Sequence, residues 1–99
     1  MKHSGDFSIG GDVWAGSSKL IEEMGELQQV LGKLIGSHGE TAHYDGTELR
    51  QRLLEEIADL TAAINFFEET NLTFDEEIAI ANRRISKLHM FRKWHKEGK

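Results

Sequence analysis

The stretch LRQRLLEEIADLTAAINFF, residues 49–67, decides the fold of this chain. Its apolar residues recur every three or four positions, which is the period of an α-helix and not that of a strand. They occupy more than one side of that helix, because Leu54 and Phe66 lie away from the main stripe that begins at Leu49 and ends at Phe67. A helix that is apolar on more than one side has to be covered on more than one side. The stretch therefore predicts a central helix that packs against several other helices.

Two further helices flank the central one in the sequence. Residues 17–35 repeat the helical period, and the central helix is expected to extend over residues 45–70. Thr73 and Glu76 then form the pattern of a capping box, which predicts the start of a third helix that ends near His95. The chain has no proline, and strand-like alternation is absent. These features predict an all-α fold, an up-down helical hairpin plus a third helix, completed as a four-helix-bundle-type homo-oligomer.

The length of the chain limits its organisation. At 99 residues, the chain is expected to be a single domain, residues 1–99, near the lower size limit for independent folding, which favours a homodimer or tetramer. Residues 1–12 are rich in Gly and Ser, so we expect a flexible lead there, and they lack the apolar run of a signal peptide. No stretch has the length of a membrane span. A cytoplasmic protein is the expectation.

Charge is unevenly distributed along the chain. There are 12 Lys and Arg against 17 Asp and Glu, a net charge of −5, which argues against a general nucleic-acid binder. Residues 83–99 contain seven Lys or Arg and one acid, so this segment carries +6 and residues 1–82 carry −11. Salt bridges between helices would account for this division. A site in which carboxylates bind a cation while basic residues contact an anionic ligand would account for it equally well.

Two pairs of acids occupy positions at which the helical pattern would place apolar residues. On a helical wheel, Glu23 falls inside the apolar stripe of the first helix, and Glu26 lies one turn later at its margin. Glu56 and Asp59 repeat this arrangement on the central helix. Converging carboxylates repel one another and are costly to bury unless a cation lies between them. Oxygen ligands suit Mg²⁺ or Mn²⁺, and Mg²⁺ accepts phosphate oxygens as further ligands. The two pairs therefore predict metal-dependent phosphate chemistry.

Two other interpretations of these acids remain. A single Glu-x-x-Glu is most often a solvated helix face, but two pairs with the same inward tilt favour a metal site. A di-iron centre in a helical bundle would require Glu-x-x-His on its helices. The chain has this spacing only between Glu40 and His43, in a loop with flanking glycines, so di-iron chemistry is disfavoured.

The segments KLIEEMGELQQVLGKLIG, residues 19–36, and LLEEIADLTAAINFF, residues 53–67, resemble the Glu-x-x-Glu and Glu-x-x-Asp motifs of the MazG-like, all-α nucleotide pyrophosphohydrolases. The C-terminal stretch NRRISKLHMFRKWHKEG, residues 82–98, is similar to the ending of their short, phage-type members. The resemblance implies cleavage of a (d)NTP to the (d)NMP and pyrophosphate, a house-cleaning reaction of the nucleotide pool. It implies Mg²⁺ as the cofactor, with Mn²⁺ as a substitute. The catalytic residues and metal ligands that it implies are the four carboxylates, Glu23, Glu26, Glu56 and Asp59.

The resemblance also bears on substrate binding. Members of the family hold phosphates with basic or amide residues of the third helix, and Lys33 is a further candidate on the first. The substrate-binding residues implied are Lys33, Asn82, Arg84 and Lys87, with Arg83 beside them. Salt bridges to the other helices are the alternative role for these side chains.

Relatives place a base-stacking aromatic residue near the second motif, where this chain has Ala63 one turn after Asp59. The aromatic residues available to replace it are Trp14, Tyr44, Phe66 and Trp94.

Other functions are compatible with the same sequence. A related dUTPase or phosphoribosyl-ATP pyrophosphatase would share the fold and the metal chemistry but differ in its contacts to base and sugar. A non-catalytic helical binding module, with the carboxylates retained as a metal staple, is the alternative from a different class.

Overall fold

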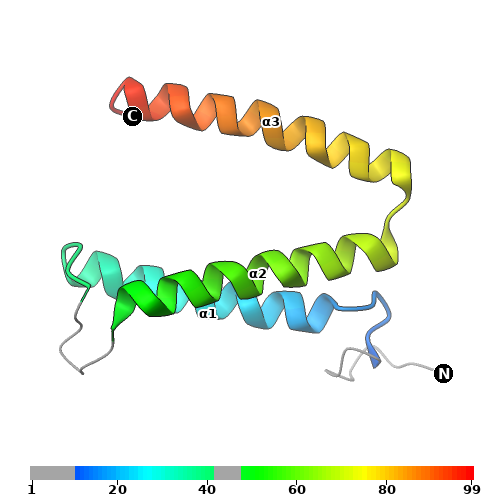
Figure 1. Ribbon diagram of the computed structural model, residues 1–99, viewed down its shortest axis with the longest axis horizontal. Coiled ribbons are helices and arrows are strands. Elements are labelled where there is room, and N and C mark those ends of the chain that lie inside the picture. The colour runs from blue at the N-terminus through cyan, green and yellow to red at the C-terminus, as the bar shows by residue number, and fades with distance from the viewer. Residues whose placement is uncertain (1–10, 42–47) are drawn as a thin grey trace.

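In the computed structural model, which describes residues 11–41 and 48–99, the chain forms three α-helices (Figure 1). α1 spans Ser17–Gly36, α2 spans Leu49–Asn71 and α3 spans Phe74–Lys96. α1 and α2 lie side by side as an antiparallel hairpin, whereas α3 turns back from the end of α2 and diverges from it (Figure 1). The predicted all-α fold with an up-down hairpin and a third helix is confirmed. The homo-oligomer stays a prediction.

Local capping determines where α2 and α3 begin. Thr73 Oγ1 accepts a hydrogen bond from Glu76 N at 3.2 Å, and Glu76 Oε1 accepts one from Thr73 N at 2.8 Å, so the predicted capping box is confirmed. The side chain of Glu48 caps α2 by accepting a hydrogen bond from Arg50 N at 2.8 Å. These bonds satisfy backbone N–H groups that have no partner within the helix. The helix was expected to begin at residue 45, which lies outside the described residues, and α2 begins at Leu49.

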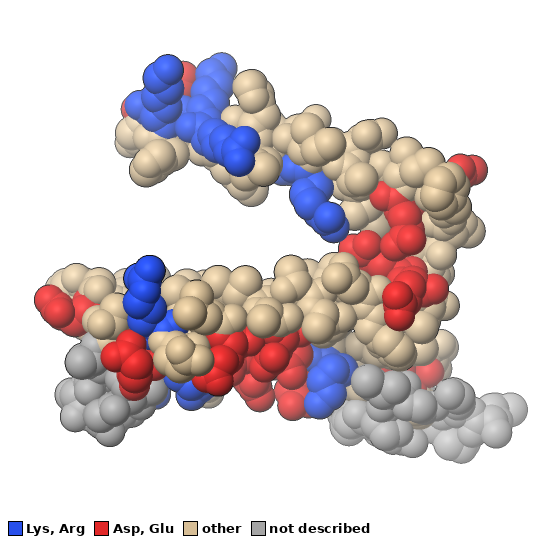
Figure 2. All heavy atoms as spheres, viewed as in Figure 1, with Lys and Arg blue, Asp and Glu red and all other residues tan. Residues whose placement is uncertain are grey.

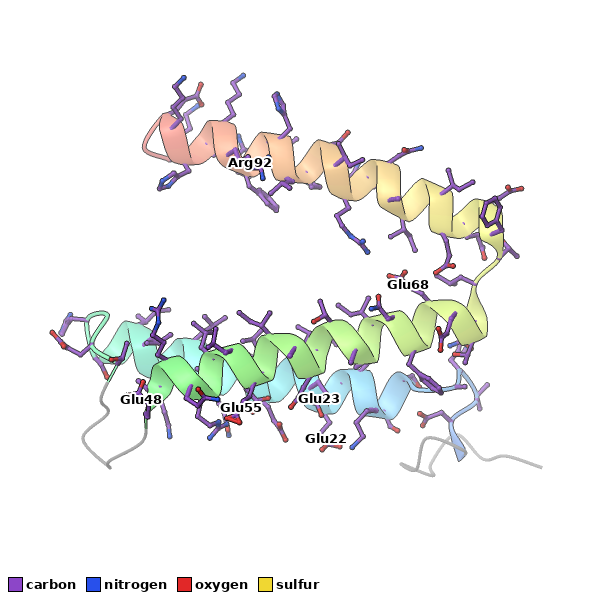
Figure 3. The ribbon with its side chains drawn as sticks, viewed as in Figure 1. Glu22, Glu23, Glu48, Glu55, Glu68 and Arg92 are labelled. Carbon is purple, nitrogen blue, oxygen red and sulfur yellow. The ribbon has the colours of Figure 1, made fainter. Side chains whose placement is uncertain are left out.

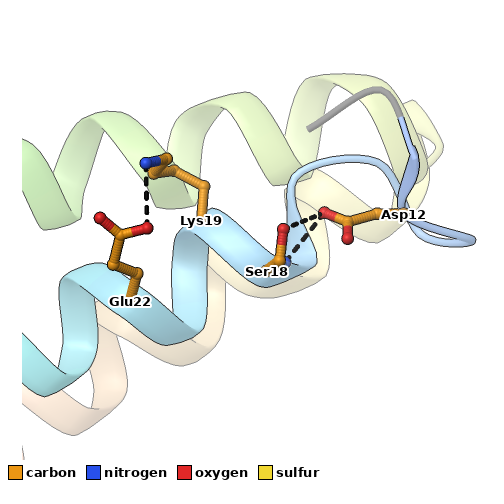
Figure 4. Close-up of polar contacts among 4 residues, drawn as sticks. All are labelled: Asp12, Ser18, Lys19 and Glu22. Atoms are coloured by element: carbon orange, nitrogen blue, oxygen red, sulfur yellow. Dashed lines mark hydrogen bonds and ion pairs between the residues drawn. The ribbon is translucent and has the colours of Figure 1, made fainter. Parts of the chain in front are cut away.

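The segment before α1 is anchored to both helices of the hairpin. Asp12 is buried and accepts hydrogen bonds from N and Oγ of Ser18 at 2.9 and 2.8 Å (Figure 4). Asn71 Nδ2, at the end of α2, donates a hydrogen bond to Ala15 O at 2.8 Å. These contacts hold the start of α1 against the end of α2. Asp12 is the last residue of the predicted flexible lead, residues 1–12, of which the first ten lie outside the described residues.

The hairpin has a small core, and much apolar surface remains outside it. Val30 and Leu49 are 1% and 0% exposed, and Ala63 is also buried. Within the described part of the chain, no residue of α3 is buried. Large exposed apolar side chains are present on all three helices, namely Ile21, Met24, Leu31 and Ile35 on α1, Leu54 and Ile57 on α2, and Phe74, Ile78, Ile85, Leu88, Met90, Phe91 and Trp94 on α3. Extended apolar surface of this kind is typical of interaction sites rather than of isolated monomers.

Charge divides between the hairpin and α3. In Figure 2, acidic side chains collect along one side of the hairpin and around the turn between α2 and α3, whereas Lys and Arg gather towards the end of α3. α3 itself begins with Asp75, Glu76 and Glu77 and ends with basic residues in its last turn, an order that complements the helix dipole. None of the helices in residues 11–41 and 48–99 combines the length and apolar character needed to cross a membrane.

Candidate metal centre

Three carboxylates from two helices converge on the side of the hairpin away from α3. One oxygen each of Glu23 on α1 and of Glu56 and Asp59 on α2 lie within 4.8 Å of one another. Two oxygens bound to one hard cation at about 2.0–2.6 Å lie at most about 4–5 Å apart. The three carboxylates are therefore close enough to share one divalent cation after small side-chain adjustments. We call them the carboxylate triad.

The position of the triad follows from the hairpin geometry. α1 and α2 run antiparallel, so the middle of α1 lies opposite the middle of α2. Figure 3 shows Glu22, Glu23 and Glu55 on the same side of the hairpin, whereas Glu68 lies on the side of α2 that faces α3. The acidic side of the hairpin is thus not covered by α3 of the same chain.

Two carboxylate oxygens of the triad are buried without a hydrogen-bond partner. Glu56 is 6% exposed, and its Oε1 atom lies 3.4 Å from Nη2 of Arg52. Its Oε2 atom, like Oε2 of Glu23, is buried and has no partner within the described structure. Asp59 is exposed. A buried oxygen without a partner is costly, and a cation held by these three side chains would supply the missing interaction.

The electrostatics of the triad differ from those of a solvated helix face. Burial is the largest cause of a raised pKa at Glu23, and the carboxylates of Glu26 and Asp59 raise it further. Burial also raises the pKa of Glu56, as does the adjacent carboxyl group of Glu26, while Arg52 opposes the shift. Metal-free protein therefore holds these acids in an environment that disfavours their charged form. Glu26 borders the triad without joining it, and its role as a metal ligand stays a prediction.

A pH dependence of stability follows for the metal-free protein. The pKa values of Glu23 and Glu56 are raised on folding, above the ordinary value of about 4.3. Their contribution to stability is therefore fully present below that ordinary value and is lost as the pH rises through the raised pKa values. In chelator, the double variant Glu23→Gln/Glu56→Gln should lose less stability than wild type as the pH rises above the ordinary pKa of a glutamate. Urea unfolding at several pH values measures this difference, and parallel curves for the two proteins would contradict it.

An open pocket of about 470 Å³ adjoins the triad. Pockets for small ligands usually combine an apolar wall with a few polar groups, at volumes of about 300–1,000 Å³. The polar part here comes from Glu23, Asp59 and Lys19. The remaining described lining is apolar or small and consists of Gly16, Ala62, Ala63 and Phe66. The pocket thus joins a potential metal site to an apolar surface that carries one aromatic ring.

Gly16 shapes the apolar end of the pocket. Its φ angle is +86°, in the left-handed region, and a Cβ atom at this position would lie 2.7 Å from Cδ2 of Phe66. Both the backbone conformation and the close approach of the ring therefore require glycine. Gly16 immediately precedes α1, so the anchored segment before that helix forms part of the pocket wall.

The side chains predicted to bind phosphates are not among the described residues that line the pocket. Lys33 lies in the last turn of α1. Asn82, Arg84 and Lys87 lie on α3, and Nη2 of Arg84 is 3.4 Å from Oε1 of Glu68. Because α3 diverges from the hairpin on the side opposite the triad, a single chain does not bring these residues to the pocket (Figure 3). Their role in substrate binding stays a prediction.

Of the aromatic residues considered for base stacking, Phe66 lines the pocket. The ring of Trp14 stacks on that of Phe67, with centroids 6.1 Å apart and planes inclined by 14°. Trp94 lies near the end of α3, and Tyr44 is outside the described residues. Among the described aromatic candidates, the structure therefore brings Phe66 to the pocket beside the triad.

Two basic residues at the site were not among the predicted ones. Lys19 precedes Glu23 by four positions and lines the pocket, and Arg52 precedes Glu56 by four positions and contacts it. Residues at this spacing share a helix face. The sequence shows a basic residue four positions before an acid in both cases. This spacing is common on exposed helices and does not by itself identify a site.

No protein-family model matches this chain, and comparison with curated proteins and with solved structures gave no significant match. The structure supports a small, all-α, three-helix protein with a possible metal-binding acidic cluster, and no family assignment follows.

Proposed function

We propose that this chain is a Mg²⁺-dependent nucleoside triphosphate pyrophosphohydrolase of the MazG-like kind, which cleaves a (d)NTP to the (d)NMP and pyrophosphate. The observation that carries the proposal is the convergence of Glu23, Glu56 and Asp59, two of which have a buried carboxylate oxygen without a hydrogen-bond partner. The donor set consists of oxygens alone, which suits Mg²⁺ and Mn²⁺ rather than softer metals.

The residues of the site have different roles in this proposed reaction. A divalent cation held by these residues would neutralise phosphate charge and lower the pKa of an attacking water molecule. Glu23 and Asp59 line the pocket as well as belonging to the triad, so a cation that they held would face the phosphates of a substrate in the pocket. Glu56, the most buried of the three, fixes the position of the site within the hairpin.

The pocket fits the two ends of a nucleotide. Its carboxylate end suits phosphates bridged by a metal, and its apolar end, with Phe66, suits the flat face of a base. Bases stack on aromatic side chains with little dependence on their identity. Phe66 therefore serves as the stacking partner that residue 63 does not provide.

The direct test is release of pyrophosphate from a panel of ribo- and deoxyribonucleoside triphosphates, with Mg²⁺ and with chelator. We expect turnover in Mg²⁺ and none in chelator. The panel includes dUTP and phosphoribosyl-ATP, since preference for either identifies the related activity instead. Folded, metal-loaded protein that releases no pyrophosphate would favour the non-catalytic, metal-stapled binding module.

A second copy of the chain completes this proposal. Leu31 on α1 and Ile57 on α2 are 44% and 46% exposed, and α3 has no buried residue within the described structure. Pairing two hairpins as a four-helix bundle would cover such surface and enlarge the small core.

Leu31→Glu should therefore dissociate the oligomer. Full burial of a leucine is worth about 1.5–3 kcal/mol, and Leu31 is 44% exposed in the single chain, so an interface would gain roughly half of that value from it. A dimer contains the substitution twice, so the dissociation constant should rise by roughly 10-fold or more. Sedimentation equilibrium measures this constant, with Gln51→Glu as the exposed control. Wild-type protein that stays monomeric at high micromolar concentration would contradict the proposed oligomer.

A further inference from the structure

Lys19 occupies a particular place in the pocket. It lies one helical turn before Glu23, on the same face of α1, and lines the pocket together with Glu23 and Asp59. Among the described residues of the lining, it is the only cation. Its Nζ atom lies 3.0 Å from Oε2 of Glu22 (Figure 4). Glu22 is not among the described residues that line the pocket.

We propose that Lys19 binds the phosphates of the substrate that extend beyond the carboxylate triad, and that Glu22 holds its ammonium group beside the pocket until the substrate arrives. The proposal rests on the proposed function, because it assigns a residue to the polyphosphate of the same substrate. The predicted roles of Asn82, Arg84 and Lys87 on α3 stay predictions beside it.

The charge of the site favours such a residue. The triad contributes three carboxylates, and Glu22 and Glu26 lie on the same helix as Glu23. One divalent cation does not neutralise the triad alone, and a nucleoside triphosphate brings several further negative charges. A cation near the open side of the triad reduces this repulsion, and an ammonium group donates hydrogen bonds to phosphate oxygens as a point charge.

Two other cations near the hairpin, Arg52 and Arg84, are paired with other acids. Arg52 contacts Glu56, and Arg84 contacts Glu68 on the side of α2 that faces α3. The side chain of Lys19, by contrast, is 44% exposed, so its long stem is able to turn from Glu22 towards a ligand. The hydrogen bond with Glu22 is the first cause of a raised pKa at Lys19, so the ammonium group is charged at neutral pH.

A plain surface ion pair is the competing interpretation. Lys19 and Glu22 are three positions apart on one helix and are both well exposed, and such pairs contribute little to stability. The two interpretations differ in what removal of the ammonium group does. A surface ion pair predicts no change in anion binding, whereas a phosphate-binding lysine predicts a specific loss.

The experiment is calorimetric titration of inorganic tripolyphosphate, in Mg²⁺, into wild type, Lys19→Met, Lys19→Arg and Lys96→Met. Lys19→Met should weaken binding by about 10- to 100-fold, the loss expected for one charge-assisted hydrogen bond. Lys19→Arg should retain most of the affinity, and Lys96→Met, which removes the same charge from the exposed end of α3, should leave it unchanged. No binding by wild type, or equal weakening by Lys19→Met and Lys96→Met, overturns the proposal.

Nucleotide turnover separates failure of this inference from failure of the enzymatic proposal. Wild type that releases pyrophosphate, with no change of tripolyphosphate affinity or KM in Lys19→Met, overturns the role of Lys19 and leaves the enzyme standing. Wild type that binds tripolyphosphate through Lys19 but hydrolyses no nucleotide supports Lys19 and overturns the enzyme. A raised KM in Lys19→Met, together with the loss of affinity, supports both.

Discussion

Glu56→Gln should abolish Mg²⁺-dependent pyrophosphate release while leaving the metal-free protein folded. Glutamine keeps the size of the side chain but loses the negative charge that a metal ligand requires. Loss of groups that merely support metal ligands usually costs about 10- to 100-fold, so loss of a ligand should lower kcat/KM by more than about 100-fold. The removed carboxylate is buried and has one unpartnered oxygen, so its replacement by a neutral amide should not unfold the hairpin.

The measurement is pyrophosphate release at saturating Mg²⁺, with circular dichroism to verify that the variant remains helical. Glu69→Gln is the matched control, because it makes the same change at an exposed position of α2. The control should retain wild-type kcat/KM. Full activity in Glu56→Gln would show that the triad is not the catalytic metal site, and the ion pair with Arg52 would then be the main role of Glu56.

Mg²⁺ or Mn²⁺ should stabilise the folded protein through the same three side chains. The triad exists only when α1 and α2 are packed, so a cation bound there favours the folded state by mass action. At a cation concentration about 100 times the dissociation constant, the free energy of unfolding should rise by about 2.7 kcal/mol. Urea unfolding with Mn²⁺, with Mg²⁺ and with chelator measures the effect.

Variants of the triad test whether the stabilisation comes from this site. Glu23→Gln and Asp59→Asn should each remove most of the stabilisation, whereas Glu69→Gln should keep it. An equal gain of stability in all of these proteins would indicate weak binding to the acidic surface in general. Unchanged stability of wild type at millimolar Mn²⁺ would exclude the triad as a metal site.

The fold was predictable where it depends on local chemistry. The apolar period of residues 49–67 gave the central helix, and Thr73 with Glu76 gave the start of α3, because a capping box involves only neighbouring residues. The first residue of α2 was predicted less well. The helix was expected to begin at residue 45, whereas in the structure Glu48 is its N-cap. The divergence of α3 from the hairpin could not be predicted, because it depends on contacts between helices that no local pattern encodes.

The candidate site was predictable to a similar degree. A helical wheel placed Glu23 and Glu56 inwards, because the period of the helix determines the face on which each carboxylate lies, and the structure brings both together with Asp59. The pocket beside them was not predictable. One wall of it depends on Gly16, whose position follows from a hydrogen bond between Asn71 and Ala15, 56 residues apart in the sequence.

Ala63 has a consequence for how this pocket is able to change during evolution. It is 8% exposed and belongs to the core, yet it also lines the pocket. An aromatic side chain introduced there for a new ligand would overfill the packed hairpin, at a cost of about 1–3 kcal/mol or more. Ala62, which is exposed and lines the same pocket, carries no such penalty. A substitution at residue 62 is therefore a more accessible way to a new ligand preference than a substitution at residue 63.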